Sequence, residues 1–422
     1  MKTRGILVAI LAVRFLSGQT PSASPFLSVP WVEVGERGQA IARVIVRNPQ
    51  DCPAIQLDGS AKRMRLRQPL PQGLRPACEL EIPHGARSAS IHGQALTLPR
   101  KDPARIIALG DTGCRIKGAE LQSCNDPGQW PFAQIAETAA ADKPDLIIHV
   151  GDYLYRETPC PAEAQAMCGG TPNGDNWETW NADFFTPAAK LLAAAPWAFS
   201  RGNHEDCNRS WRGWFYYLDP RPWNGVCEAF SAPYLIKLGA FELVMLDSAS
   251  VSANTLNEDQ ATRYAAQLSS LHPVKAWLAD HHPFWGLRTD SADGKPAPVS
   301  PTLEAAWDRA SPKGIELVLS GHIHIFELLS FPGSRPAQLV AGDGGTNLAV
   351  PIQGSIDGLS VQGVRIGAGQ TQSQFGYTRF ARHGKTWDVS LQNRAGEPLI
   401  RCNLAVIGNN TTTKCFTDIS RR

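Results

Sequence analysis

The stretch PWAFSRGNHEDC, residues 196–207, places Gly, Asn, His and Glu in succession directly after a short apolar run. An amide beside an imidazole adds little to a hydrophobic core, because both groups need hydrogen-bond partners once they are buried. The same two groups are suitable ligands for a metal ion. Two ligands do not complete a metal site, so any such site needs further ligands from other parts of the chain.

Polar groups of the same kind follow other apolar runs between residues 105 and 345. These runs are RIIALGD (105–111), DLIIHVGD (145–152), WAFSRGN (197–203), FELVMLDS (241–248), VKAWLADHH (274–282), IELVLSGHIH (315–324) and AQLVAGDGG (337–345). In open α/β sheets, ligands gather outside the carboxyl ends of the strands, where glycine allows a sharp turn. The candidate ligands at these ends are Asp111, Asp152 with Tyr155 a turn later, Asn203 with His204, His281 with His282, and His322 with His324.

This set combines carboxylates, imidazoles, an amide and a phenol, and it contains no thiol. Mixed oxygen and nitrogen ligands suit iron, zinc or manganese. With one carboxylate able to bridge, the set is large enough for two metal ions. Two ions about 3.5–4 Å apart are a common device for in-line displacement at phosphorus, so the pattern predicts a phosphoester hydrolase.

The surrounding pattern predicts the elements that must position these groups. Apolar strands that alternate with helical segments indicate a layered α/β domain over residues 101–422. Within it, residues 257–271 are predicted to form a helix with Asn257 as its N-cap, and the tail from residue 374 is predicted to add hairpin strands to a sheet edge. Residues 25–100 alternate in short runs, which predicts a small N-terminal all-β domain.

The blocks GDTG, GDYLY, GNHE, LADH and GHIH resemble the five signature blocks of the calcineurin-like metallophosphoesterases. Tyr155 lies three residues after the second aspartate, and in this feature the sequence resembles the purple acid phosphatase branch of that family. The resemblance covers roughly residues 104–347 and is much weaker in the N-terminal region. It implies a metallophosphoesterase-type β-sandwich flanked by helices.

Carried onto this sequence, the resemblance implies two metal sites that share one ligand. The first metal would be held by Asp111, Tyr155 and His324, the second by Asn203, His281 and His322, with Asp152 bridging both. A phenolate favours a trivalent ion, so the expected pair is Fe(III) with zinc, manganese or divalent iron. The fourth block contains a second histidine, His282, which is the alternative to His281.

The resemblance also implies that His204 faces the substrate, binds its phosphate and protonates the leaving group. The alternative is that His204 only positions Asn203. The expected reaction is hydrolysis of phosphomonoesters by in-line attack of a metal-bound hydroxide. Three other functions stay open: a phosphodiesterase or nucleotide hydrolase on the same core, a catalytically silent metal-binding protein, and an iron–tyrosinate oxidase.

The charge balance argues against a nucleic-acid partner. The chain has 41 Lys and Arg against 39 Asp and Glu, but three basic residues lie in the first 24 residues, which contain no acid, so 41 − 3 leaves 38 against 39. A near-neutral body offers no basic surface for nucleic acid. No apolar run after residue 24 approaches the ~20 residues that a membrane span needs. The expected partner is a small phosphoester substrate.

Two features predict export to the periplasm or the medium. Residues 1–24 combine a basic start, an apolar stretch at Ile6–Val13 and small residues after it, which is typical of a signal peptide. The ten cysteines follow one another as near neighbours in the sequence, which suggests the disulfide pairs 52–78, 114–124, 160–168, 207–227 and 402–415. Spacing alone does not fix the pairing. The chain has no C-x-x-C cluster of the kind that a thiolate metal site would need. Disulfides persist in oxidising compartments.

Overall fold

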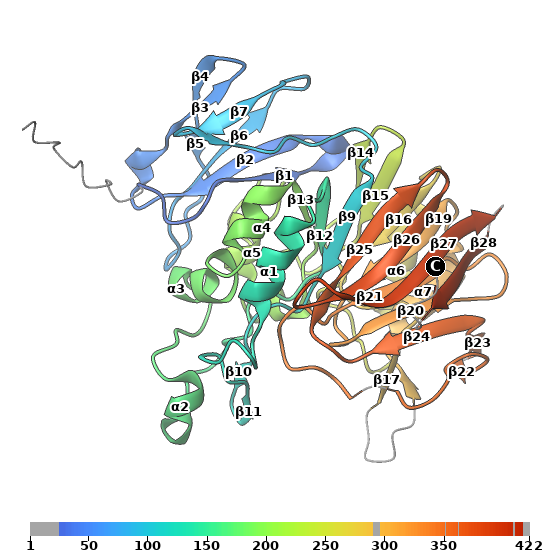
Figure 1. Cartoon of the computed structure of the whole chain (residues 1–422). Helices are drawn as coiled ribbons and strands as arrows, with labels where there is room; N and C mark the ends of the chain where they lie inside the picture. Colours follow the sequence, from blue (N-terminus) through green and yellow to red (C-terminus); the bar gives the residue numbers. More distant parts are fainter. Residues whose placement is uncertain (1–24, 290–295, 351, 362, 408–409, 417–422) are drawn as a thin grey trace, which may run out of the picture.

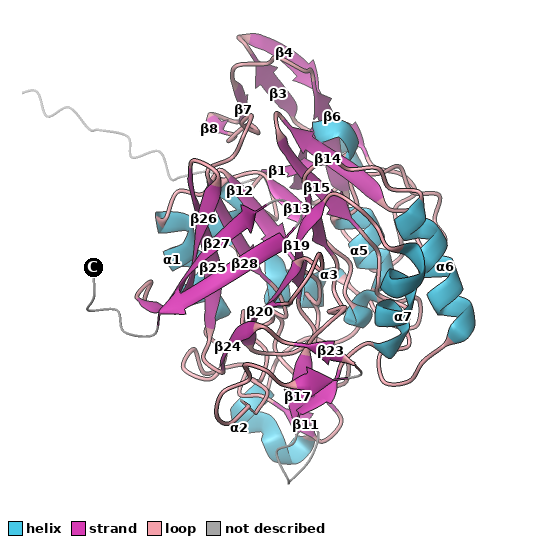
Figure 2. Ribbon diagram, turned by 90° about the vertical axis from the view of Figure 1, so that its right-hand side faces the viewer, coloured by secondary structure: helices cyan, strands magenta, loops and turns pink. Residues whose placement is uncertain are grey.

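The computed structural model describes residues 25–289, 296–350, 352–361, 363–407 and 410–416 (Figure 1). Two large β-sheets pack face to face, and helices cover their outer faces (Figures 1 and 2). This layered arrangement confirms the predicted α/β fold class. The predicted signal peptide, residues 1–24, lies outside the described residues.

The first sheet has eleven strands and contains the first three ligand-bearing strands at its centre. Its order is β28 (Asn410–Phe416), β27 (Pro398–Ile407), β26 (Thr386–Asn393), β25 (Gly376–His383), β9 (Arg105–Leu109), β12 (Leu146–His149), β13 (Trp197–Phe199), β1 (Trp31–Val34), β2 (Ala40–Ile45), β6 (Ala77–Ile82) and β5 (Arg65–Leu66). Strands β9, β12 and β13 are parallel, so their carboxyl ends lie at one edge. The tail strands β25 to β28 extend the sheet beside β9, as predicted.

The second sheet has seven strands and carries the remaining ligand-bearing strands. Its order is β14 (Tyr234–Leu238), β15 (Phe241–Met245), β16 (Ala276–Ala279), β19 (Ile315–Ser320), β21 (Ala337–Ala341), β20 (Phe326–Ser330) and β24 (Ala368–Gln372). Strands β15, β16, β19 and β21 are parallel. The smaller sheets are β10 (Ile116–Lys117) with β11 (Glu120–Leu121), β17 (Leu287–Thr289) with β18 (Pro296–Pro298), and β22 (Ser360–Val361) with β23 (Val364–Arg365).

Side chains on alternate faces of the strands explain why the runs are apolar throughout. On β9, Ile106 points into the core between the two sheets, and Ile107 points into the core under the helices of the first sheet. Strands that are buried on both faces lose the polar alternation of a half-exposed strand. Trp277 of β16 lies in the central core, where its ring centroid is 4.8 Å from that of Phe380 on β25. The two sheets therefore share one continuous core.

Helices close the two outer faces. The first sheet is covered by α1 (Phe132–Ala141), α3 (Trp177–Trp180), α4 (Ala189–Ala194) and α5 (Trp211–Tyr217), and the second by α6 (Glu258–Ser269) and α7 (Pro301–Ala310). A short helix, α2 (Gln165–Cys168), lies in a peripheral loop. The Asn257 side chain accepts a hydrogen bond from the Gln260 N–H at 3.0 Å, which confirms the predicted N-cap of α6.

The N-terminal region is rich in strands, as predicted, and four of them continue the first sheet. Glu33 of β1 pairs in parallel with Trp197 of β13, and β2, β6 and β5 follow outward. The other four form a separate sheet in the order β4 (Ser60–Arg63), β3 (Ala54–Leu57), β7 (Ala89–Ile91) and β8 (Gln94–Ala95). Buried Arg43 on β2 donates hydrogen bonds to the carbonyls of Tyr217 and Asp219 at 2.8 Å. The division at residue 100 stays a prediction.

All five predicted disulfides are present: Cys52–Cys78, Cys114–Cys124, Cys160–Cys168, Cys207–Cys227 and Cys402–Cys415. Three of them close loops at the carboxyl edge of the first sheet. Cys402–Cys415 joins the paired strands β27 and β28, and Cys52–Cys78 joins the segment before β3 to β6. Among the described residues, no helix has both the length and the apolar character needed to cross a membrane.

Candidate metal centre

The backbone at the strand ends adopts a conformation that most side chains avoid. Asp111 after β9, Asp152 after β12 and His322 after β19 have positive φ angles of 55°, 60° and 69°. A residue other than glycine held in this left-handed region costs of the order of 1–3 kcal/mol, and such residues concentrate at functional sites. The conformation of Asp111 is held by backbone bonds from its N–H to the Gly151 carbonyl and from Thr346 N–H to its own carbonyl, both 2.9 Å.

The glycines before Asn203 and His322 are required because atoms of the two aspartates lie too close for a side chain at either position. A Cβ atom on Gly202 would lie 2.0 Å from Asp152 Oδ1 and 2.1 Å from its backbone nitrogen. A Cβ atom on Gly321 would lie 2.4 Å from Asp111 Oδ2. The Gly-Asn and Gly-His pairs of the sequence therefore allow neighbouring strand ends to meet as well as to turn.

The predicted ligands of the first metal surround the Tyr155 hydroxyl. This oxygen lies 2.9 Å from Asp111 Oδ1, 2.8 Å from Asp152 Oδ2 and 3.1 Å from His324 Nε2. His324 Nε2 lies 3.5 Å from Asp111 Oδ1, and its Nδ1 contacts the Asn347 carbonyl at 2.8 Å. Four predicted ligands from three separate blocks thus converge on one point.

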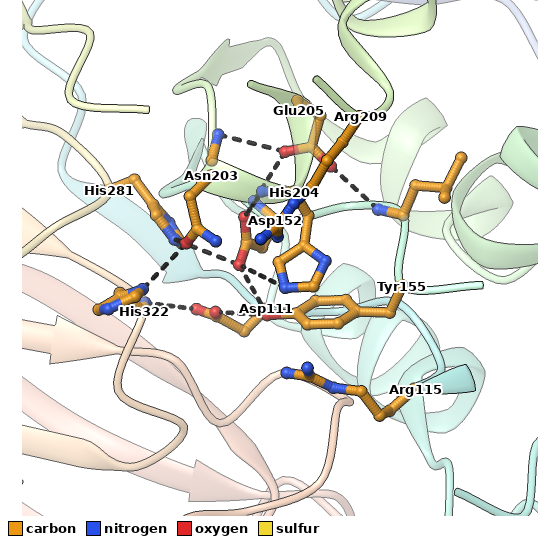
Figure 3. Close-up of polar contacts among 12 residues, drawn as sticks. Asp111, Arg115, Asp152, Tyr155, Asn203, His204, Glu205, Arg209, His281 and His322 are labelled. Carbon is orange, nitrogen blue, oxygen red and sulfur yellow. Dashed lines mark hydrogen bonds and ion pairs between the residues drawn. The ribbon is translucent and has the colours of Figure 1, made fainter. Parts of the chain in front are cut away.

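The predicted ligands of the second metal surround the side-chain oxygen of Asn203. This Oδ1 atom lies 2.9 Å from His281 Nε2 and 3.0 Å from His322 Nδ1. His281 Nε2 also lies 3.2 Å from Asp152 Oδ2, the atom that faces Tyr155 (Figure 3). Asp152 therefore lies between the two groups of predicted ligands, and its role as a bridging carboxylate stays a prediction.

Of the two neighbouring histidines, His281 is the one whose ring reaches these atoms. Its Nδ1 contacts the Val150 carbonyl at 2.8 Å, which orients Nε2 toward Asn203. His282 is also buried, and its ring packs against that of His322 in a tilted arrangement with centroids 4.1 Å apart. His282 thus packs beside the cluster without a contact to either aspartate. The assignment of His281 as ligand stays a prediction.

The pKa values of three predicted ligands favour their protonated forms. Burial and the nearby Asp152 raise the pKa of Asp111 well above its ordinary value. Burial would lower the pKa of His281, but Asp152 and Asp111 outweigh it and raise the pKa to about 10. Burial and the two carboxylates also raise the pKa of the Tyr155 phenol well above its usual range. A bound cation favours the forms that bind metals, which are a carboxylate, a phenolate and a neutral imidazole.

These features fit metal ions. Ligand atoms of Asp111, Asp152 and His281 lie within 4.8 Å of one another, and all three residues are buried. Buried carboxylates without a cation are costly, whereas metal coordination satisfies them. The donors are oxygen and imidazole nitrogen, as iron, zinc and manganese prefer.

His204 lies beside the cluster and makes a contact that the sequence did not predict. Its Nδ1 lies 2.5 Å from Glu157 Oε1, and its Nε2 lies 3.9 Å from Asp152 Oδ2. Its own backbone N–H donates to Asp152 Oδ1 at 2.9 Å, which links the third block to the second. Burial lowers the pKa of His204, and the carboxylates of Asp152 and Glu157 oppose that shift. The only sequence signal for Glu157 is its place five residues after Asp152 in the block GDYLYRE.

Glu205, next to His204 in the third block, is buried. Its Oε1 accepts hydrogen bonds from the backbone N–H groups of Tyr153 at 2.9 Å and Leu154 at 3.1 Å, and its Oε2 accepts from Asp152 and Gly202, both at 3.2 Å. Burial, with the charge of Asp152, raises the pKa of Glu205 to about 8. Glu205 therefore fixes the turn that presents Asp152 and Tyr155 (Figure 3).

The cluster opens to solvent through a hollow of 530 Å³. Asp152, Asn203, His204, His322 and His324 lie at its floor, and Arg115, Lys117, Arg209 and Arg288 are among the residues around it. The Arg115 guanidinium carbon lies 4.6 Å from the Tyr155 ring centroid (Figure 3). His149, by contrast, is packed away from the hollow, with its ring stacked on Tyr153 at 4.0 Å.

Comparison with known proteins agrees with this architecture. The family model of the calcineurin-like phosphoesterases matches residues 104–326, more than half of the chain. The structure of PhoD is similar in fold, with a TM-score of 0.57 and 11% identity over 95% of this chain and 94% of that one. The purple acid phosphatase PPD1 of yellow lupin (Lupinus luteus) seeds has a TM-score of 0.56 and 12% identity over 91% of this chain and 73% of that one.

At these identities the two structures show a shared fold and not a shared substrate. No curated protein matches the sequence. The family match covers the strand ends that carry Asp111, Asp152, Asn203, His281 and His322. The chain therefore belongs to the calcineurin-like phosphoesterase family and is a phosphoric ester hydrolase.

Proposed function

We propose that this protein is an exported phosphatase that hydrolyses phosphomonoesters with the aid of two metal ions. The observation that carries the proposal is the position of Asp152 Oδ2, 2.8 Å from the Tyr155 hydroxyl and 3.2 Å from His281 Nε2. A carboxylate oxygen between two separate sets of ligands suits a pair of ions better than a single ion.

The first ion would be held by Asp111, Tyr155 and His324, and the second by Asn203, His281 and His322, with Asp152 shared. Tyr155 supports Fe(III) at the first position, since a hard anionic phenolate favours a trivalent ion, and zinc, manganese or divalent iron takes the second. When bound, the two ions supply a nucleophile at neutral pH and neutralise the charge that develops on the phosphoryl oxygens.

The residues of this chain provide the remaining steps. His204 lies at the floor of the hollow and donates a proton to the leaving oxygen. Glu157 contacts His204 Nδ1 at 2.5 Å, so the ring presents its other nitrogen to the substrate. Arg115 and Arg209 line the same hollow and attract the dianionic phosphate group.

The proposal of export is supported by the five disulfides and by the predicted signal peptide. The expected location is the periplasm or the medium. The fold similarity to a purple acid phosphatase supports the same branch for this chain, with Tyr155 as its marker.

The first experiment is to measure the metal content and visible spectrum of protein purified from an oxidising compartment. About two metals per chain and a broad absorption in the visible region would support a ferric ion bound to Tyr155. Two colourless metals would retain the phosphatase and remove the iron–phenolate assignment. One metal or none in an active, folded protein would overturn the use of two ions.

Rates on substrates separate the alternatives. A higher kcat/KM for a diester such as bis(p-nitrophenyl) phosphate than for p-nitrophenyl phosphate would favour a phosphodiesterase. Negligible turnover of both by fully metal-loaded protein would favour a metal-binding role, and peroxide formation that exceeds phosphate release would favour an oxidase.

A further inference from the structure

Arg201 and Asp247 form a buried ion pair that joins the two large sheets beside the candidate metal centre. Arg201 follows β13 of the first sheet, and Asp247 follows β15 of the second. The Nε atom of Arg201 donates to Asp247 Oδ1 at 3.1 Å, and its Nη2 atom donates to Oδ2 at 2.6 Å. Two parallel N–H donors fix both the distance and the direction of such a contact. The pair therefore fixes the end of β13 relative to the end of β15.

Each partner of this pair is close to a predicted ligand of the second ion. Asn203 lies two residues after Arg201 in the chain. Ser248 follows Asp247 directly, and its hydroxyl oxygen accepts a hydrogen bond from the backbone N–H of His281 at 3.0 Å. The ion pair thus links the segment that presents Asn203 to the segment that presents His281.

The sheets are joined differently on the side of the first ion. There the backbone N–H of Thr346, which follows β21, donates to the carbonyl of Asp111 at 2.9 Å. Residues 199–205 and 245–250 are all described, and no backbone hydrogen bond joins these two segments. On the side of the second ion, the two charged side chains make the connection that backbone groups make on the other.

Both partners are also held by groups other than each other. Arg201 Nη2 donates to the carbonyl of Glu228 at 2.6 Å. The carboxylate of Asp247 accepts the backbone N–H groups of Ala249 at 3.1 Å and Ser231 at 3.3 Å. A guanidinium can serve several acceptors in one plane, which the ammonium group of a lysine cannot. The pair therefore acts as a spacer of fixed length between the two strand ends.

We infer that Arg201 and Asp247 are positioning residues, which hold Asn203 and His281 at the separation that the second ion requires. This inference rests on the proposed use of two ions. Neither residue of the pair is a predicted ligand, and neither lines the hollow above the cluster. Groups that orient metal ligands typically contribute 10- to 100-fold to metal affinity. Because this pair acts through the backbone, we expect its loss to weaken the second ion about tenfold and to leave the first ion unchanged.

The test is calorimetry with Zn²⁺ on metal-free protein, which measures the Kd of each bound ion. Asn203→Ala identifies the ion at the second position, since this variant lacks one of its predicted ligands. The double variant Arg201→Met/Asp247→Leu should raise the Kd of that same ion about tenfold. Replacing a buried ion pair with apolar side chains of similar size is often neutral for stability, so the double variant should fold.

A second buried ion pair supplies the matched control. Arg43 Nη1 lies 2.8 Å from Glu33 Oε1, and Arg43 also donates to two backbone carbonyls, as Arg201 does. This pair lies on β2 and β1, and neither of its residues lines the hollow. Arg43→Met/Glu33→Leu should bind both ions with the wild-type Kd. A rise in the Kd of the second ion in this control would overturn the inference.

Arg201→Lys keeps the inference testable if the double variant does not fold. Lysine retains the positive charge beside Asp247 but lacks paired donors in a fixed plane. This variant should also raise the Kd of the ion that depends on Asn203, with no change for the other ion. Wild-type affinity for both ions, or equal weakening of both, would overturn the inference and leave the proposed function intact.

The number of ions bound by the wild-type protein separates the inference from the proposed function. If the wild type binds one ion, the use of two ions fails. The inference then stands if that ion is lost in Asn203→Ala and weakened in Arg201→Lys, and it fails if the ion depends on neither residue. A folded wild-type protein that binds no ion would overturn both.

Discussion

Replacing Glu157 with glutamine should weaken proton donation by His204 without removing a metal ligand. Glu157 Oε1 lies 2.5 Å from His204 Nδ1, and the Glu157 side chain is only 18% exposed. Glutamine keeps an oxygen at this position and removes its charge. A hydrogen bond to a charged group contributes about 1.5–3 kcal/mol and a neutral one about 1 kcal/mol, so the expected cost is roughly 1 kcal/mol.

The loss of the negative charge destabilises the protonated form of His204. Burial already lowers the pKa of His204, and Glu157 opposes that shift, so Glu157→Gln should lower this pKa further. Above the new pKa, fewer molecules carry the proton that the leaving oxygen needs. We expect kcat/KM at neutral pH to fall about fivefold for an alkyl phosphate, with recovery as the pH is lowered.

The assay is the pH dependence of kcat/KM for an alkyl phosphate and for p-nitrophenyl phosphate. The p-nitrophenolate ion leaves with little need of a proton, so its loss should be much smaller. Glu137→Gln is the control, since Glu137 forms an exposed ion pair with Lys190 on the outer face of the protein. Equal losses for both substrates with an unshifted pH profile would refute the role of Glu157 in proton donation.

Three further predictions concern the backbone, the phenol and a buried carboxyl. Gly202→Ala should lower kcat/KM by about 100-fold and reduce metal content, because its Cβ would lie 2.0 Å from Asp152 Oδ1. Tyr155→Phe should abolish the visible absorption and retain the ion at the second position, as metal analysis and spectra would show. Burial raises the pKa of Glu327 to about 8, so its contribution to stability is greatest below the unfolded pKa near 4.5 and is lost as the pH rises toward 8. Glu327→Gln should therefore gain about 1 kcal/mol per pH unit relative to the wild type between pH 5 and 8, measured by unfolding at each pH.

Each of these has a result that would contradict it. Full metal content and normal activity in Gly202→Ala would mean that the strand ends tolerate separation. An unchanged spectrum in Tyr155→Phe would remove the phenolate from the iron. Parallel stability profiles for Glu327→Gln and the wild type across this pH range would mean that Glu327 is ionised in the folded protein.

The sequence predicted the arrangement of the site because each block combines a strand with its own turn. The apolar run sets the strand, the glycine sets the turn, and the next side chain must lie at the carboxyl edge. Parallel pairing of β9, β12 and β13, and of β16 and β19, then brings the blocks together. Asp111, Asp152 and Asn203 needed no further information to be placed on one edge.

Other contacts depend on paths that no local pattern encodes. Glu157 reaches His204 because the segment after Tyr155 turns back over the third block, which periodicity does not reveal. In the same way, Glu33 of β1 lies opposite Trp197 of β13, far away in the sequence. Alternation predicts that β1 is a strand, but it does not identify its partner.

The strained edge of the sheets also explains why disulfides gather there. Asp111, Asp152 and His322 hold left-handed backbone conformations that cost of the order of 1–3 kcal/mol each. Loops that follow two of the strands bearing ligands are closed by Cys114–Cys124 and Cys207–Cys227, and a disulfide typically contributes about 2–4 kcal/mol by restricting the unfolded chain. The first of these loops carries Arg115 and the second carries Arg209, so the constraints that offset strain also hold the cations at the mouth of the site. The core between the sheets holds the strand ends that carry the predicted ligands, and these disulfides hold the loops that carry Arg115 and Arg209.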